Sequence, residues 1–110
     1  MRYIVTKAKA ILPKQRRLTK NGNIVTICAW AVPRSKDYPE GICYSFQLIS
    51  DGARILGYDN NTHEGHHRHF IKDGKLMKKA IPFDGLAQLF DQFEKEVLEF
   101  EKKFRTKLSK

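Results

Sequence analysis

Four histidines lie within seven residues in the second half of the chain: His63, His66, His67 and His69. Histidine has an unperturbed pKa of about 6.5, so its ring can accept or donate a proton at neutral pH. Alternate residues of a β-strand point to opposite faces of the sheet. In a strand, His67 and His69 would share one face, and His66 and Arg68 would share the other. This spacing predicts two imidazoles close together on one surface.

Further polar residues stand just before the histidines, where Tyr58, Asp59 and Asn60 end a strand-like run. A hairpin connection would bring Asp59 and Asn60 beside the imidazole rings. The segment would then combine a carboxylate, an amide, imidazoles and a guanidinium. We take Asp59 as a catalytic candidate, and Tyr58 and Asn60 as candidates for substrate binding.

This set of groups suits the cleavage of RNA. The 2′-OH of RNA is an internal nucleophile, so one base and one acid suffice without a metal. We predict that His67 and His69 are the acid/base pair, that Asp59 orients one ring, and that Arg68 or Tyr58 contacts a phosphate. Arg68 would point away from both histidines in a regular strand, so its catalytic role requires a β-bulge or a sheet edge.

Two other interpretations of the histidines stay open. In one, His67 and His69 bind a divalent metal such as Zn²⁺ together with Asp59 or His63. No third ligand has diagnostic spacing, so we expect no metal or other cofactor. In the other interpretation the hairpin is structural, and its rings satisfy backbone groups.

The elements that position these residues are predicted by turn signals and hydrophobic periodicity. Asn-Gly or Asp-Gly pairs stand at 21–22, 51–52 and 73–74, each between runs rich in Val, Ile, Thr, Tyr and Phe. The predicted strands are residues 3–12, 23–32, 42–49, 54–60, 67–72 and 75–81. Longer connections occupy residues 33–41 and 61–65. Such hairpin-linked strands pair antiparallel, in chain order.

After Pro82 the period changes to that of an amphipathic helix, with Asp84 as its predicted N-cap. One apolar stripe recurs at alternating steps of four and three residues: Leu86, Phe90, Phe93, Val97, Phe100 and Phe104. We expect this stripe to pack across the sheet; a seam for a partner helix is the alternative. The predicted fold is α+β, a meander-like antiparallel sheet of five or six strands with one long C-terminal helix, in a single domain over residues 1–110.

Length and composition exclude several classes of protein. The 110 residues suit one domain, and a hydrophobic content of 41% supports one modest core. No run approaches the ~18–20 apolar residues of a membrane helix. The N-terminus does not resemble a signal peptide, and two cysteines cannot make a disulfide scaffold. We expect a soluble cytoplasmic protein without membrane association.

The charge is strongly basic and unevenly distributed. Lys and Arg number 21 against 12 acids, a net charge of +9, and residues 1–36 carry nine of these cations and no acid. A one-sided excess of this kind suits a polyanion such as RNA. Lys14, Arg16 and Arg17 are therefore candidates for substrate binding.

Four segments together resemble the TumE-type family of small prokaryotic proteins: residues 30–33 (Trp-Ala-Val-Pro), 44–48 (Tyr-Ser-Phe-Gln-Leu), 57–60 (Gly-Tyr-Asp-Asn) and 67–70 (His-Arg-His-Phe). In that family a Tyr-Asp-Asn motif precedes a His-Arg-His motif by a short Gly-containing loop. The family's closing amphipathic helix is similar to residues 83–104. The resemblance covers residues 23–104, and the pair of motifs is its most specific part.

The resemblance implies the toxin component of a toxin–antitoxin module, paired with a small helix-turn-helix antitoxin and suspected, by analogy, of ribonuclease activity. The family commonly has an acid directly before His-Arg-His, where this chain has His66. If that acid takes part in the chemistry, His66 replaces it or the activity is altered.

We therefore predict a toxin that is a metal-independent endoribonuclease. A non-catalytic module that binds nucleic acid or the antitoxin is the alternative, and a metal-dependent nuclease is the third. The sequence is also compatible with a homodimer.

Overall fold

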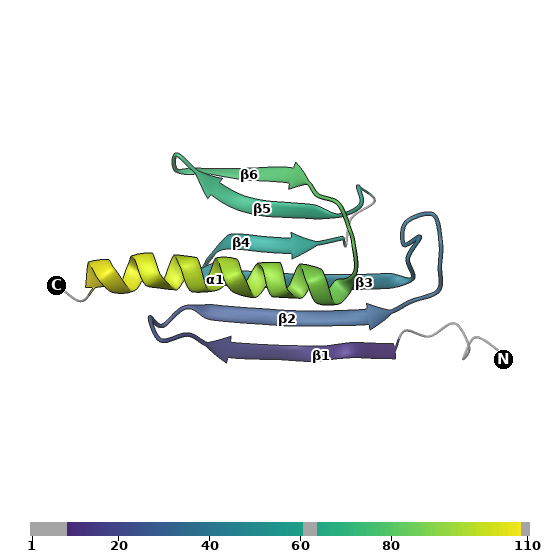
Figure 1. Ribbon diagram of the computed structural model, residues 1–110, viewed down its shortest axis with the longest axis horizontal. Helices are drawn as coiled ribbons and strands as arrows, with labels where there is room; N and C mark the ends of the chain where they lie inside the picture. The colour runs from purple at the N-terminus through teal and green to yellow at the C-terminus, as the bar shows by residue number, and fades with distance from the viewer. Residues whose placement is uncertain (1–8, 61–63, 109–110) are drawn as a thin grey trace.

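The computed structural model describes residues 9–60 and 64–108, with side chains as far as residue 103. Six strands form one antiparallel sheet in chain order, and the helix lies on one face of it (Figure 1). The elements are β1 (Lys9–Leu18), β2 (Ile24–Ala31), β3 (Ile42–Ser50), β4 (Ala53–Asp59), β5 (His67–Lys72), β6 (Lys75–Ala80) and α1 (Leu86–Leu108). This confirms the predicted α+β meander with a long C-terminal helix. No helix in the described part of the chain is long and apolar enough to cross a membrane.

The Asp-Gly pairs form tight hairpins as predicted. Asp51 and Gly52 have φ values of 52° and 77°, and Asp73 and Gly74 have 53° and 77°. Positive φ at both central residues is typical of the type I′ turn, whose twist matches that of the strands it joins. These turns fix the pairing of β3 with β4 and of β5 with β6.

The first strand extends beyond its predicted end at residue 12, because β1 continues through Pro13 to Leu18. Residues 3–8 of the predicted strand lie outside the described residues. Pro13 is tolerated because β1 is an edge strand, and the register of β1 on β2 shifts between Ala10 and Leu12 and again between Leu12 and Gln15. The predicted end of this strand at residue 12 was therefore wrong.

The described part of the apolar stripe of α1 packs on the sheet, as predicted, so the partner-helix alternative is not needed to explain it. The side chain of Phe104 lies outside the described residues. Phe93 is fully buried, with its ring 5.6 Å from that of Phe46 and 5.8 Å from that of Tyr58. Val97 and Leu89 are also buried. α1 runs along β3, over the middle of the sheet (Figure 1).

The start of α1 corrects one detail. The helix begins at Leu86, and the carbonyl of Gly85 accepts the hydrogen bond from the Leu89 backbone N–H, at 3.1 Å. Gly85 therefore occupies the N-cap position that was predicted for Asp84. Gly85 has a φ of 121°, a conformation that a side chain disfavours.

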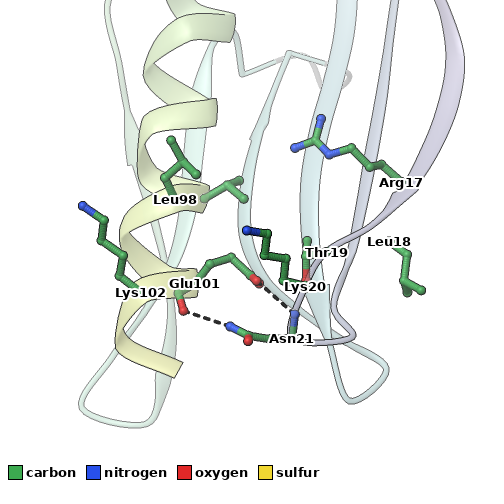
Figure 2. Close-up of a pocket in the computed structure, with 9 residues that line it drawn as sticks. Arg17, Leu18, Thr19, Lys20, Asn21, Leu98, Glu101 and Lys102 are labelled. Carbon is green, nitrogen blue, oxygen red and sulfur yellow. Dashed lines mark hydrogen bonds between the residues drawn. The ribbon is translucent and has the colours of Figure 1, made fainter. Parts of the chain in front are cut away.

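Polar contacts hold the turn between β1 and β2 against the end of α1 (Figure 2). The side-chain amide of Asn21 donates to the Glu101 carbonyl at 2.9 Å, and that of Asn23 donates to the Glu101 carboxylate at 2.8 Å. Asn23 is only 4% exposed. Helix packing and these contacts lie on one face of the sheet, and no element of the described chain covers the other, which we call the open face.

We predict that Phe93→Ala lowers the free energy of unfolding by about 3–5 kcal/mol, because it removes the aromatic contact that joins α1 to the sheet. Leu98→Ala is the matched control on the same helix. Leu98 is 62% exposed, so its loss should cost less than about 0.5 kcal/mol. Urea unfolding measures both, and equal losses would contradict this packing.

Candidate functional site

The register of β4 on β5 brings the predicted acid beside the predicted histidines. Asp59 pairs with His67, and Gly57 pairs with His69. Tyr58 is buried in the core, so its neighbours Gly57 and Asp59 face the opposite way. Asp59, His67 and His69 therefore share the open face, as the strand alternation predicted.

Asp59 holds the ring of His69. The Asp59 Oδ2 atom lies 3.2 Å from His69 Nε2, and the two side chains are only 8% and 13% exposed. A carboxylate only accepts hydrogen bonds, so Nε2 carries the hydrogen of a neutral His69 ring. The Nδ1 atom then keeps its lone pair and can accept a proton.

The environment favours a neutral His69. Burial lowers its pKa below the usual value, and the Asp59 carboxylate opposes that shift while the Arg54 cation adds to it. His67 and Lys78 lower the pKa further. At neutral pH His69 is therefore an uncharged base.

His67 is fixed by the loop that precedes β5. Its Nδ1 atom donates to the Gly65 carbonyl, at 3.0 Å, and its Nε2 atom lies 3.6 Å from Glu64 Oε1. Glu64 also accepts from Lys78 Nζ, at 2.5 Å, and this bond lowers the pKa of the Glu64 carboxyl. A proton on Nε2 of His67 would thus face an ionised carboxylate.

Arg54 also belongs to this group, although strand alternation does not select it. A bulge between β3 and β4 turns Arg54 onto the open face, where its Nη1 atom lies 3.7 Å from Asp59 Oδ2. The side chain runs across Gly57, where a Cβ atom would stand only 3.0 Å from Arg54 Cδ. A glycine inside a strand, a sign of close approach by another group, was the one available signal.

Arg68 and Tyr58 do not join the histidines. The pairing of β4 with β5 is regular, so the bulge that a joint site would need is absent from it. Arg68 instead binds Glu96 of α1 through two bonds, of 3.1 and 2.5 Å, and the Tyr58 hydroxyl donates to the same carboxylate. Burial raises the pKa of the Tyr58 hydroxyl, and Tyr58 is fully buried. Both side chains face the helix.

Asn60 is also buried, at 1% exposure. Its Oδ1 atom accepts from the Tyr44 backbone N–H at 2.9 Å, and its Nδ2 atom donates to the Ile42 carbonyl at 2.8 Å. Its amide is thus turned onto the backbone of β3 rather than toward the imidazoles.

His66 lies on the helix side, opposite to His67 and His69, as predicted. Its ring stacks on Phe83 at 4.4 Å between centroids. Its Nδ1 atom lies 2.9 Å from the Tyr44 hydroxyl, and its Nε2 atom lies 3.1 Å from Glu40. This placement separates His66 from the Asp59 group.

The predicted basic residues of β1 are divided between the two faces. Arg17 pairs in register with the buried Val25, points toward α1 (Figure 2) and binds the Glu94 carboxylate at 2.8 Å. Arg16 pairs with Thr26 and so faces the open side. Lys14 lines a cavity on that side, of about 390 Å³.

The cavity in Figure 2 is separate from this chemistry. Its volume is about 310 Å³, and it lies between the β1–β2 turn and α1. It is lined by Arg17, Leu18, Thr19, Lys20, Asn21, Val97, Leu98, Glu101 and Lys102, with no histidine among them.

The described residues contain no group of three His, Cys, Asp or Glu side chains arranged to hold a metal ion. His63, which the metal interpretation offered as a ligand, lies outside the described residues.

We predict that the pKa of His69 responds in opposite directions to its two charged neighbours. Asp59→Asn removes the group that raises this pKa, so the pKa should fall further below its usual value. Arg54→Gln removes a cation that lowers it, so the pKa should rise. Titration of the His69 ring by NMR measures both, and shifts of the same sign would contradict the arrangement.

One comparison with known proteins found a match. The family model described as Toxin TumE matches residues 3–101. No curated protein and no solved structure matches the chain. The matched region spans all six strands and most of α1, including the Asp59 group. The chain therefore belongs to the TumE toxin family, which indicates the toxin component of a toxin–antitoxin module, with an antitoxin as its partner.

Proposed function

We propose that this toxin is an endoribonuclease in which His69 is the general base and His67 the general acid. The observation that carries the proposal is the 3.2 Å contact of Asp59 with His69, on the same face of β5 as His67. Residues two apart on a strand stand roughly 6.6 Å apart, a span that a phosphodiester group can bridge.

In the proposed reaction the Nδ1 atom of His69 takes the proton of the RNA 2′-OH. The 2′-oxygen then attacks the adjacent phosphorus, and the bond from phosphorus to the 5′-oxygen breaks. His67 gives its Nε2 proton to that leaving oxygen. The products are a 2′,3′-cyclic phosphate and a free 5′-OH, so no water or metal enters this step.

We assign the phosphate contact to Arg54 instead of Arg68, because Arg68 faces the helix. Arg54 is the guanidinium beside Asp59 and is 31% exposed. A guanidinium matches the geometry of phosphate oxygens and can stabilise the charge that develops on them. Tyr58 and Asn60 then act indirectly, by holding β4 against α1 and β3.

We predict that His69→Gln and His67→Asn each reduce RNA cleavage by about 10²–10⁴-fold, because each removes one proton-transfer group. Gln can still donate to Asp59, and Asn to the Gly65 carbonyl, so the thermal midpoint should change little. Cleavage of a defined RNA, with detection of the cyclic phosphate end, measures the effect.

His66→Ala is the control for this experiment and should show the reverse pattern. Cleavage persists, while the thermal midpoint falls because the stack on Phe83 is lost. Full cleavage by folded His67 and His69 variants would refute the proposed pair.

We also predict that cleavage survives removal of divalent metal. The two imidazoles supply both proton transfers, so EDTA-treated protein should cleave at the untreated rate. Loss of activity in EDTA, with recovery on one equivalent of zinc, would favour the metal-dependent nuclease instead.

A second candidate function, a non-catalytic binding module, is favoured by one observation. Leu18 and Leu98 are 72% and 62% exposed, and both line the cavity in Figure 2 together with Lys20. Exposed apolar side chains beside a lysine suit docking of a partly apolar, acidic protein segment. A small helix-turn-helix antitoxin is the proposed partner, and RNA, in the cytoplasm, remains the proposed substrate. Unchanged toxicity of the folded histidine variants would support this function over catalysis.

A further inference from the structure

A row of mostly polar residues crosses the open face from one edge of the sheet to the other. The strand registers align one residue of each strand: Arg16, Thr26, Gln47, Gly57, His69 and Lys78. We call this set the cross-sheet row. Gly57 has no side chain, and the side chain of Arg54 lies over its position in the row. The row therefore has cations near both ends and the proposed base, His69, within it.

A recess lies beside the row, at the end near β1. It is the cavity of about 390 Å³ whose lining includes Lys14, Thr26, Ser45 and Gln47. Gln47 donates to the Ser45 hydroxyl at 3.1 Å. Beside Ile27, Cys28 and Ile49, the lining of this recess presents hydroxyl and amide groups, which can bond to the edge of a nucleobase, and a lysine that can hold a phosphate.

Trp30 stands on the same face of β2, two residues beyond Cys28, and is 37% exposed. An exposed indole on a polar surface is a platform on which a base can stack. It is also the only tryptophan in the chain.

We propose that the cross-sheet row is a binding track for single-stranded RNA that leads to the histidines. Arg16 and Lys14 hold backbone phosphates, and Gln47 and Thr26 contact a base in the recess. Trp30 offers a stacking surface beside them. This inference rests on the proposed ribonuclease function and adds to it the form of the substrate and the residues that bind it.

The size of the track fits a short single strand. Five strand-to-strand steps of about 4.8 Å give about 24 Å, room for roughly four nucleotides. The base edges of a duplex are paired and stacked, so they could not bond to the amide of Gln47 in the recess. The track therefore selects unpaired RNA.

Arg16 and Arg17 provide a matched test, because they are neighbours of equal charge on opposite faces of β1. The probe is a single-stranded 2′-O-methyl oligonucleotide of about 12 residues, which lacks the attacking hydroxyl and cannot be cleaved. Fluorescence anisotropy of the labelled probe measures affinity. Quenching of Trp30 reports whether the probe occupies the open face.

Arg16→Gln should weaken binding about three- to tenfold and reduce the slope of log K against log salt by about 0.7, since one phosphate contact is lost. Arg17→Gln should leave the affinity unchanged, because Arg17 lies on the face covered by α1, where it is bound to Glu94. Gln47→Leu should weaken binding by a similar factor with no change in salt slope, because it removes a base contact and no charge. Thermal midpoints confirm that each variant is folded.

Three results would overturn the inference: equal losses in Arg16→Gln and Arg17→Gln, binding without quenching of Trp30, or tighter binding of the matching duplex. The result for cleavage is separate. If Arg16→Gln and Gln47→Leu bind the probe normally while the His67 and His69 variants lose cleavage, the proposed track is wrong and the proposed ribonuclease function is supported. If Arg16→Gln and Gln47→Leu lose binding while the His67 and His69 variants still cleave RNA, the proposed acid/base pair is wrong instead.

Discussion

One-sided burial is the constraint on which the rest of this structure depends. A six-stranded sheet has two faces, and α1 covers only one of them. The aromatic side chains that join sheet and helix, Tyr44, Phe46, Tyr58 and Phe93, are all fully buried on the covered face. Because a one-residue slip would exchange the two faces, this packing sets the register of β2, β3 and β4, whose apolar side chains form the core. It thereby decides which polar side chains reach the open face.

The two motifs of the family divide along this constraint. In β4 and β5, Asp59, His67 and His69 face outward, whereas Tyr58 and Arg68 face inward and share one carboxylate of α1, that of Glu96. The outward-facing residues of the two motifs are thus available for contact with a ligand. The other half ties the same two strands to the helix, which restricts the movement of the outward groups. A change at Arg68 would act on the site through position rather than by contact with substrate.

Periodicity and turn chemistry predicted most of the fold. Asp-Gly pairs predict hairpins because Asp and Gly accept positive φ, and the change of period after Pro82 predicts the helix. The strand through Pro13 was not predictable from the same rules. Periodicity stops the strand before Pro13, whereas the first strand of a meander in chain order is an edge strand, where a proline is tolerated.

The candidate site was predictable only as far as strand alternation holds. Alternation placed His67 and His69 together and Arg68 away from them. It could not place Arg54, because a bulge in β4 reverses the alternation at that residue. It also could not show that the Asn60 amide bonds to the backbone of β3, since that depends on the end of a neighbouring strand.

Ion pairing differs between the two faces, and the difference bears on where a polyanion can bind. On the covered face the acids of α1 neutralise the nearby cations, Glu94 with Arg17 and Glu96 with Arg68. Arg68 and Glu96 are each about three-quarters buried, so separating them would leave a desolvated charge. On the open face the pair of Lys78 and Glu64 is about half exposed, and exposed pairs contribute only about 0–1 kcal/mol. A phosphate can therefore replace Glu64 on Lys78 at little cost, whereas it cannot replace Glu96 on Arg68. The open face thus holds an exchangeable positive charge beside the two histidines.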